Sequence, residues 1–127
     1  DLLRFEQRGG MLRNILTPQV PAAAAQAADH VLREVLSAAG VTREQIGAWI
    51  WHAGGREVLL ALRKQLKLSE ADVRHSAAVL QEFGNISSPC VYFVLQATLA
   101  DNAPGGLWWM SSFGAGFSCH GALLEVE

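Results

Sequence analysis

The chain has 127 residues, of which 50% are hydrophobic and 17% are charged, so it has the length of one domain and can bury a core. The formal net charge is −2, and no run of Lys and Arg marks a nucleic-acid surface. The longest strongly apolar stretch, CVYFVLQATLA, is shorter than the ~20 residues that a membrane span needs. We therefore expect a globular domain that binds neither nucleic acid nor membrane.

The cysteines and the first residues bear on cellular location. Cys90 and Cys119 form no CxxC motif, which fits a reducing cytoplasm better than a disulfide-rich secreted protein. The initial DLLRFEQRGG has no basic segment leading into an apolar core, so it does not predict a secretory signal. It also lacks an initiator Met. We expect a cytoplasmic protein, and we expect this chain to begin inside a longer polypeptide.

An extended segment and a long helix come first. Residues 2–16 predict extended structure interrupted at Gly9–Gly10. Pro21 opens a helix, where its missing N–H costs nothing, and Gly40 ends that helix. Its apolar face recurs at helical spacing, at Ala24, Ala27, Ala28, Val31, Leu32, Val35 and Leu36.

The next segment, AWIWH at residues 48–52, predicts a central strand. It follows a short turn, for which Thr42 and Gln45 have capping-box spacing. Both faces of the strand are apolar, which is typical of a strand covered by helices on both sides. His52 ends the strand, and Gly54–Gly55 turn the chain into a helix. That helix has its apolar face at Val58, Leu59, Leu62 and Leu66.

Two further helices are predicted before the last strands. Ser69 and Asp72 have the spacing of a helix start, and Gly84 ends that helix. Its expected core residues are Val73, Ala77 and Leu80. Residues 85–99 are apolar nearly all round, which indicates a buried helix with Pro89 in its first turn.

The chain ends in two adjacent strands, residues 107–113 and 117–126, joined by a glycine-containing loop. The order of elements is strand, helix, strand, helices, strand, strand. This order predicts one α/β domain over residues 1–127, with a mixed sheet between helical layers.

Two residues at expected strand and helix ends are candidates for chemistry. His52 lies at the carboxyl end of a strand, where ligands of open α/β sheets collect, although a histidine there can also simply cap the strand. Asn85 follows a helix-ending glycine and can serve as an N-cap. An amide and an imidazole can also donate hydrogen bonds to one oxygen, and two donors aimed at a developing oxyanion form an oxyanion hole.

Three ordered motifs carry a family resemblance. WIWHAGGREVLLAL, FGNISSPCVYFVL and SFGAGFS resemble the C-terminal half of type III polyketide synthases, the chalcone and stilbene synthase family. The N-terminal LRFEQRGGMLRNILTPQVP is similar to this family as well. The resemblance implies the second half of a thiolase-like fold and a homodimer. It also implies that acyl-CoA and malonyl-CoA are substrates and that no cofactor is bound permanently.

The resemblance assigns roles residue by residue. His52 and Asn85 match the catalytic histidine and asparagine of the family, and Ser87 matches a serine that lines the cavity. The backbone that passes the coenzyme A arm is matched by Gly54 and Gly55. A cavity-shaping loop is matched by Gly114, Ala115 and Gly116. Both Ala53 and Ala115 stand where the family commonly has proline.

The nucleophile of the family is a cysteine in the N-terminal half, and neither cysteine of this chain matches it. Cys90 and Cys119 fall in a predicted helix and strand, where we expect small core residues. The isolated chain is therefore expected to be inactive. The remaining histidines, His30, His75 and His120, match no family motif and have no metal-ligand spacing, so we expect no metal site.

The resemblance implies a mechanism in which His52 forms an ion pair with the cysteine of the other half. With Asn85, it then stabilises the enolate formed when malonyl-CoA loses carbon dioxide. Two alternatives remain open. One is a ketoacyl synthase of the type that initiates fatty-acid synthesis, which usually has His-Gln-Ala-Asn where this chain has His-Ala-Gly-Gly. The other is a non-catalytic binding or dimerising module.

Overall fold

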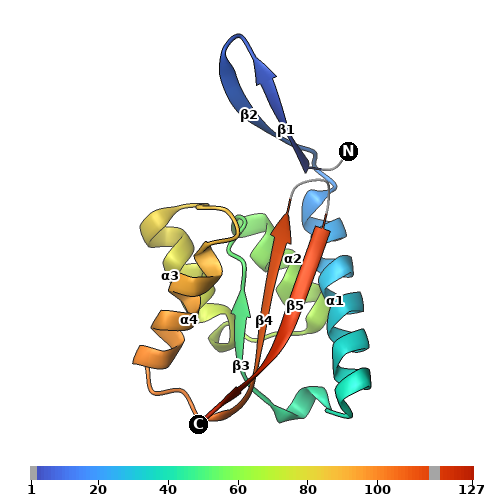
Figure 1. Cartoon of the computed structure of the whole chain (residues 1–127), viewed down its shortest axis with the longest axis vertical. Coiled ribbons are helices and arrows are strands. Elements are labelled where there is room, and N and C mark those ends of the chain that lie inside the picture. Colours follow the sequence, from blue (N-terminus) through green and yellow to red (C-terminus); the bar gives the residue numbers. More distant parts are fainter. Residues whose placement is uncertain (1–2, 115–117) are drawn as a thin grey trace.

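The computed structural model describes residues 3–114 and 118–127, without the side chains of residues 3–6 and 11–16. Figure 1 shows a three-stranded sheet with helices packed around it and a separate hairpin near the N-terminus. Its elements, in chain order, are β1 (Leu3–Arg8), β2 (Met11–Leu16), α1 (Val20–Ala39), η1 (Arg43–Gln45), β3 (Ile46–Trp51), α2 (Arg56–Leu66), η2 (Ala71–Val73), α3 (Arg74–Phe83), α4 (Cys90–Ala100), β4 (Gly106–Gly114) and β5 (Ser118–Val126).

The interrupted extended segment forms an antiparallel hairpin. Strand β1 pairs with β2 from Leu3 opposite Leu16 to Arg8 opposite Met11. Gly9 and Gly10 make the turn with φ values of 60° and 77°. A tight hairpin turn with positive φ at both central residues favours glycine, so this pair explains where the chain reverses. In Figure 1 the hairpin projects away from the sheet and its helices.

The main sheet is mixed, as expected. Strand β3 pairs in parallel with β4, which pairs in antiparallel fashion with β5. The expectation that residues 48–52 form a central strand is wrong within the described residues: the strand ends at Trp51, and β3 lies at the edge of the order β3-β4-β5. Apolar residues on both faces indicate helices above and below a strand, but they do not indicate how many strands flank it.

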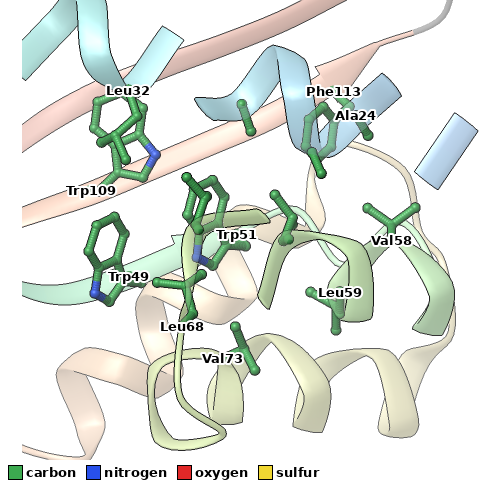
Figure 2. Close-up of a cluster of buried hydrophobic side chains, with 14 of the residues drawn as sticks. Ala24, Leu32, Trp49, Trp51, Val58, Leu59, Leu68, Val73, Trp109 and Phe113 are labelled. Atoms are coloured by element: carbon green, nitrogen blue, oxygen red, sulfur yellow. The ribbon is translucent and has the colours of Figure 1, made fainter. Parts of the chain in front are cut away.

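Helices cover the sheet on both faces. Trp49 and Trp51 point toward α1 and α2, in the cluster of buried side chains that Figure 2 shows. Ala48 and Ile50 point the other way and pack with residues of α3 and α4. The ring centroids of the two tryptophans are 5.8 Å apart. Alternation along β3 thus divides the core into two clusters, and the predicted layers are confirmed.

Most helix boundaries agree with the expectations. Gly40 ends α1 in the left-handed conformation, with φ 66°. At η1, the Thr42 N–H donates to Oε1 of Gln45 at 2.8 Å. Before α3, Ser69 and Asp72 exchange reciprocal hydrogen bonds of 2.9 and 3.1 Å between side chains and backbone N–H groups.

Two helices differ from the expectations. Ala77 of α3 is exposed, and the buried face of α3 instead carries Ser76 and Val79. Helix α4 begins only at Cys90 and is not buried all round, because Tyr92, Phe93 and Leu99 are exposed. Among the described residues, no helix has the length and apolar character to span a membrane.

Candidate active site

The backbone and one ring nitrogen hold His52 in place at the carboxyl end of β3. Its N–H donates to the Ser111 carbonyl in β4 at 2.9 Å. The Phe113 N–H, two residues further along β4, donates to Nδ1 of the imidazole at 3.1 Å. The side chain is buried, and its ring lies 5.8 Å from the Phe113 ring between centroids. Strand β4 therefore fixes both the position and the orientation of the imidazole.

These contacts decide where the imidazole proton lies. Because Nδ1 accepts a hydrogen bond, the proton of the neutral ring is on Nε2. Burial lowers the pKa of His52, and the adjacent Asn85 side chain opposes this shift less strongly. Nε2 is buried and has no hydrogen-bond partner among the described residues. A buried donor without a partner is costly, so this N–H is available to an oxygen atom of a ligand.

Asn85 lies beside this donor, as expected. It is not an N-cap, since α4 begins five residues later, at Cys90. Its Oδ1 accepts a hydrogen bond from the Ser87 N–H at 3.0 Å, and its Nδ2 donates to the Gly54 carbonyl at 3.1 Å. The second of these bonds joins the loop before α4 to the loop after His52. An amide group has two N–H donors, so one remains beyond the Gly54 bond.

The first glycine after His52 lies close to the imidazole ring. A β-carbon on Gly54 would stand 3.8 Å from Nε2, in van der Waals contact with the ring. Gly55 has φ 151°, which other residues rarely adopt. Ser87 also has a left-handed backbone, with φ 65°. Non-glycine residues in this conformation are strained and concentrate at functional sites.

Gly114 lies at the end of β4, directly after Phe113. A β-carbon there would approach Oγ of Ser118 to 2.7 Å, so a side chain at this strand end would require the Ser118 hydroxyl to turn away. The other two predicted loop residues, Ala115 and Gly116, lie outside the described residues.

An apolar hollow of about 790 Å³ opens beside Gly54 and Gly55. The segment that leads into α1 lines one side, and the first turns of α2 line the other. Arg56 and Lys64 are exposed cations at its edge. Its size suits a small-molecule ligand, and its apolar walls with a few charged groups are typical of such sites.

Neither cysteine has the surroundings of a nucleophile. Cys90 is fully buried, and its Sγ accepts a hydrogen bond from the Ala53 N–H at 3.1 Å. Cys119 is partly buried, with its Sγ 3.7 Å from Oγ of Ser111. Burial raises the pKa of both thiols, which disfavours the reactive thiolate. These surroundings agree with the structural roles expected of both residues.

The other histidines lie apart from this site. His30 pairs with Glu34 at 3.2 Å on α1, and His75 lies 3.2 Å from Asp101. His120 is exposed on β5. Among residues 3–114 and 118–127, no group of three His, Cys, Asp or Glu side chains could hold a metal ion.

Sequence reasoning missed three partners of the His52 segment: the Phe113 N–H, the Ser76 hydroxyl and the Cys90 thiol. A backbone N–H has no sequence signal, and serine is ordinarily assigned to the exposed face of a helix. The burial of Cys90 was expected, but no pattern in the sequence indicates that its sulfur accepts a hydrogen bond from Ala53.

Comparisons with known proteins agree on one family. The family model for the C-terminal domain of chalcone and stilbene synthases matches residues 5–125. The 3,5-dihydroxyphenylacetyl-CoA synthase of Streptomyces toyocaensis is 32% identical over 129 residues, which cover 98% of this chain and 33% of that protein. The 3-ketoacyl-CoA synthase 17 of Arabidopsis thaliana is 42% identical over 74 residues, which cover 57% of this chain and 15% of that protein.

Among solved structures, PKS-I from the brown alga Ectocarpus siliculosus matches with a TM-score of 0.86 and 28% sequence identity. The match covers 98% of this chain and 35% of that one, so the chain spans about a third of the length of such relatives. It confirms the expected α/β, thiolase-like fold with two adjacent final strands. The chain therefore belongs to the chalcone and stilbene synthase family and corresponds to the C-terminal domain of these proteins.

Proposed function

We propose that this domain works within a type III polyketide synthase that condenses an acyl-CoA starter with malonyl-CoA. The observation that carries the proposal is the buried Nε2–H of His52, which lies beside Asn85 and has no partner among the described residues. Relatives named 3,5-dihydroxyphenylacetyl-CoA synthase and 3-ketoacyl-CoA synthase support coenzyme A thioesters as substrates. No permanently bound cofactor is needed for this chemistry.

In the proposed reaction, Nε2–H of His52 and Nδ2–H of Asn85 both donate to the carbonyl oxygen of the malonyl thioester. The bond between C2 and the carboxylate carbon breaks, carbon dioxide leaves, and the electron pair forms an enolate whose charge rests on that oxygen. The enolate carbon then attacks an acyl thioester held on a cysteine, and the cysteine thiolate leaves. Hydrogen-bond donors fixed before the charge develops stabilise it without reorganisation.

We propose that the rest of the polypeptide supplies this cysteine. The resemblance implied an ion pair between His52 and the thiolate, but an imidazolium would direct an Nδ1–H at the Phe113 N–H. We therefore propose that the neutral ring activates the cysteine by donating a hydrogen bond from Nε2. On this account the isolated domain neither forms an acyl-enzyme nor releases a product.

We propose that the hollow beside Gly54 and Gly55 takes the coenzyme A arm. The hollow begins at Gly54 and Gly55, which follow His52 by two and three residues, and extends along α2 from Arg56 to Lys64. At 1.5 Å per residue, these two cations are about 12 Å apart along the helix axis. The apolar walls suit the pantetheine chain, and the cations suit the phosphates of coenzyme A. In this arrangement we expect Ser87 and Gly114 at the acyl end of the substrate.

We infer that the exposed apolar face of α3 and α4 packs against the N-terminal half of the same polypeptide. Phe83, Tyr92, Phe93 and Leu99 are 46%, 67%, 41% and 51% exposed, and the rings of Phe83 and Phe93 lie 5.1 Å apart. Exposed apolar patches mark interfaces, and the contact between Phe83 and Phe93 joins α3 to α4 in such a patch. The homodimer and the cytoplasmic location remain proposals, the first from the family resemblance and the second from two free cysteines.

The test is carbon dioxide release from malonyl-CoA by the intact polypeptide that carries this domain. The proposal expects release by the unmodified protein and strongly reduced release by His52→Ala. Product analysis then separates a polyketide synthase from the alternatives. A single two-carbon extension would favour a ketoacyl synthase, and an unmodified protein that releases no carbon dioxide would favour a binding module.

A further inference from the structure

The outer edge of β3 is closed by side chains next to His52. The His52 N–H bonds to Ser111 in β4, so the backbone groups of Trp51 and Ala53 point to the opposite side. Within residues 3–114 and 118–127, no strand pairs with β3 on that side. Trp51 and Ala53 are fully buried, and buried backbone groups require partners.

A single hydroxyl satisfies the backbone of Trp51. Oγ of Ser76, in α3, accepts a hydrogen bond from the Trp51 N–H at 3.3 Å and donates one to the Trp51 carbonyl at 3.0 Å. Ser76 is fully buried, and its side chain makes the contacts that a neighbouring strand would otherwise make. This accounts for a serine on the inward face of α3.

A thiol satisfies the next outward-pointing donor. Sγ of Cys90, the first residue of α4, accepts the hydrogen bond from the Ala53 N–H at 3.1 Å. Sulfur is a weak acceptor, but both residues are fully buried, so the thiol is the partner that the Ala53 N–H finds in place of solvent. The two side chains therefore bind the residues immediately before and after His52, from two different helices.

Two further polar groups of His52 itself are bonded as well. The His52 carbonyl accepts from the Gly54 N–H at 3.0 Å, and the Phe113 N–H holds Nδ1. With the backbone fixed on both sides and one ring nitrogen engaged, Nε2 has one direction in which to point. Preorganisation of this kind decides how well a donor meets a developing charge.

We propose that Ser76 and Cys90 are positioning residues, which aim Nε2 of His52 by closing the edge of β3 on both sides of it. This inference rests on the proposed function for its kinetic readout. It assigns neither residue a contact with substrate, so the effect of losing either should appear in kcat and not in KM.

The experiment compares Ser76→Thr with Ser76→Val in the intact polypeptide. The two replacements have the same shape, and only threonine keeps the hydroxyl. Ser76→Val should lower kcat for carbon dioxide release by ~10–100-fold, the scale of a misplacement near 1 Å, whereas Ser76→Thr should stay close to the unmodified protein. Thr98→Val is the matched control, because the buried Thr98 hydroxyl in α4 bonds to the Val94 carbonyl and to no other group in the part of the chain that the structure describes.

Equal kcat values for the two Ser76 variants, or an equal loss in Thr98→Val, would overturn the proposal. If Ser76→Val does not fold, Cys90→Ser against Cys90→Ala makes the same comparison on the other side of His52. Spectra of ¹⁵N-labelled histidine, assigned with His52→Gln, give a readout independent of activity. Ser76→Val should lose the single Nε2–H tautomer of His52, whereas Ser76→Thr should keep it. Retention of that tautomer in Ser76→Val would contradict the proposal. This readout does not depend on the proposed function, so it holds even if the unmodified protein releases no carbon dioxide.

Discussion

Replacing Asn85 with alanine should separate cysteine acylation from decarboxylation. The change removes a donor to the thioester oxygen, and loss of one such donor lowers rates by about 10²–10³. It also removes the hydrogen bonds to Gly54 and from Ser87. A hydrogen bond of this kind contributes roughly 0.5–1.5 kcal/mol to stability, and the lower values apply here because the Asn85 side chain is exposed. The two bonds together therefore contribute about 1–2 kcal/mol. That loss leaves a typical domain folded, so it does not explain a slower reaction.

The assay pairs acyl-enzyme formation, followed by intact-protein mass spectrometry, with carbon dioxide release from malonyl-CoA. Asn85→Ala should load a starter acyl group and decarboxylate malonyl-CoA poorly, whereas His52→Ala should fail at both steps. Ser88→Ala is the control in the same loop, since its exposed side chain makes no hydrogen bond among the described residues. Normal decarboxylation by Asn85→Ala, or a loading defect equal to that of His52→Ala, would refute the assigned roles.

Three further predictions concern substrate binding, packing and pH. Lys64→Glu should raise KM for malonyl-CoA about tenfold, or ~1.4 kcal/mol. It should not change KM for malonyl-pantetheine, which lacks the coenzyme A phosphates. Arg63 lines the neighbouring groove between α2 and α3, so the control variant Arg63→Glu should change neither KM value. Gly121→Ala places a β-carbon 2.3 Å from the Trp109 ring and should cost about 1–3 kcal/mol in urea unfolding, less when combined with Trp109→Phe. Burial lowers the pKa of His52, so below pH ~6.5 the unfolded chain binds a proton that the folded chain does not. Stability should therefore fall as the pH drops through that region, and His52→Gln should flatten this part of the curve.

Local patterns predicted the elements well, because each boundary has its own chemical signal. Gly40 ends α1 through a left-handed backbone, and Gly9–Gly10 make the hairpin turn. The apolar periodicity of a helix also predicts which of its residues are buried, as it does for the buried face of α2. The pairing of His52 with Asn85 came from the family resemblance, since 33 residues separate them and no local pattern joins them.

Features that depend on distant contacts were missed. Ser76 is polar and is ordinarily placed in solvent, yet it is buried because its hydroxyl replaces a strand at the edge of β3. The apolar sequence of α4 predicts burial, but Tyr92 and Leu99 have no cover within the described residues. A helix that is apolar all round needs apolar partners on every side. Its sequence does not show whether those partners belong to the same domain or to another part of the protein.

The most direct test of the proposed site is a crystal structure of the intact polypeptide with a non-hydrolysable analogue of malonyl-CoA. The proposal expects the carbonyl oxygen of the analogue within hydrogen-bonding distance of both Nε2 of His52 and Nδ2 of Asn85. It also expects the coenzyme A arm in the hollow beside Gly54 and Gly55. An analogue whose carbonyl oxygen lies away from both donors, or a protein group bonded to Nε2 in its place, would contradict the account.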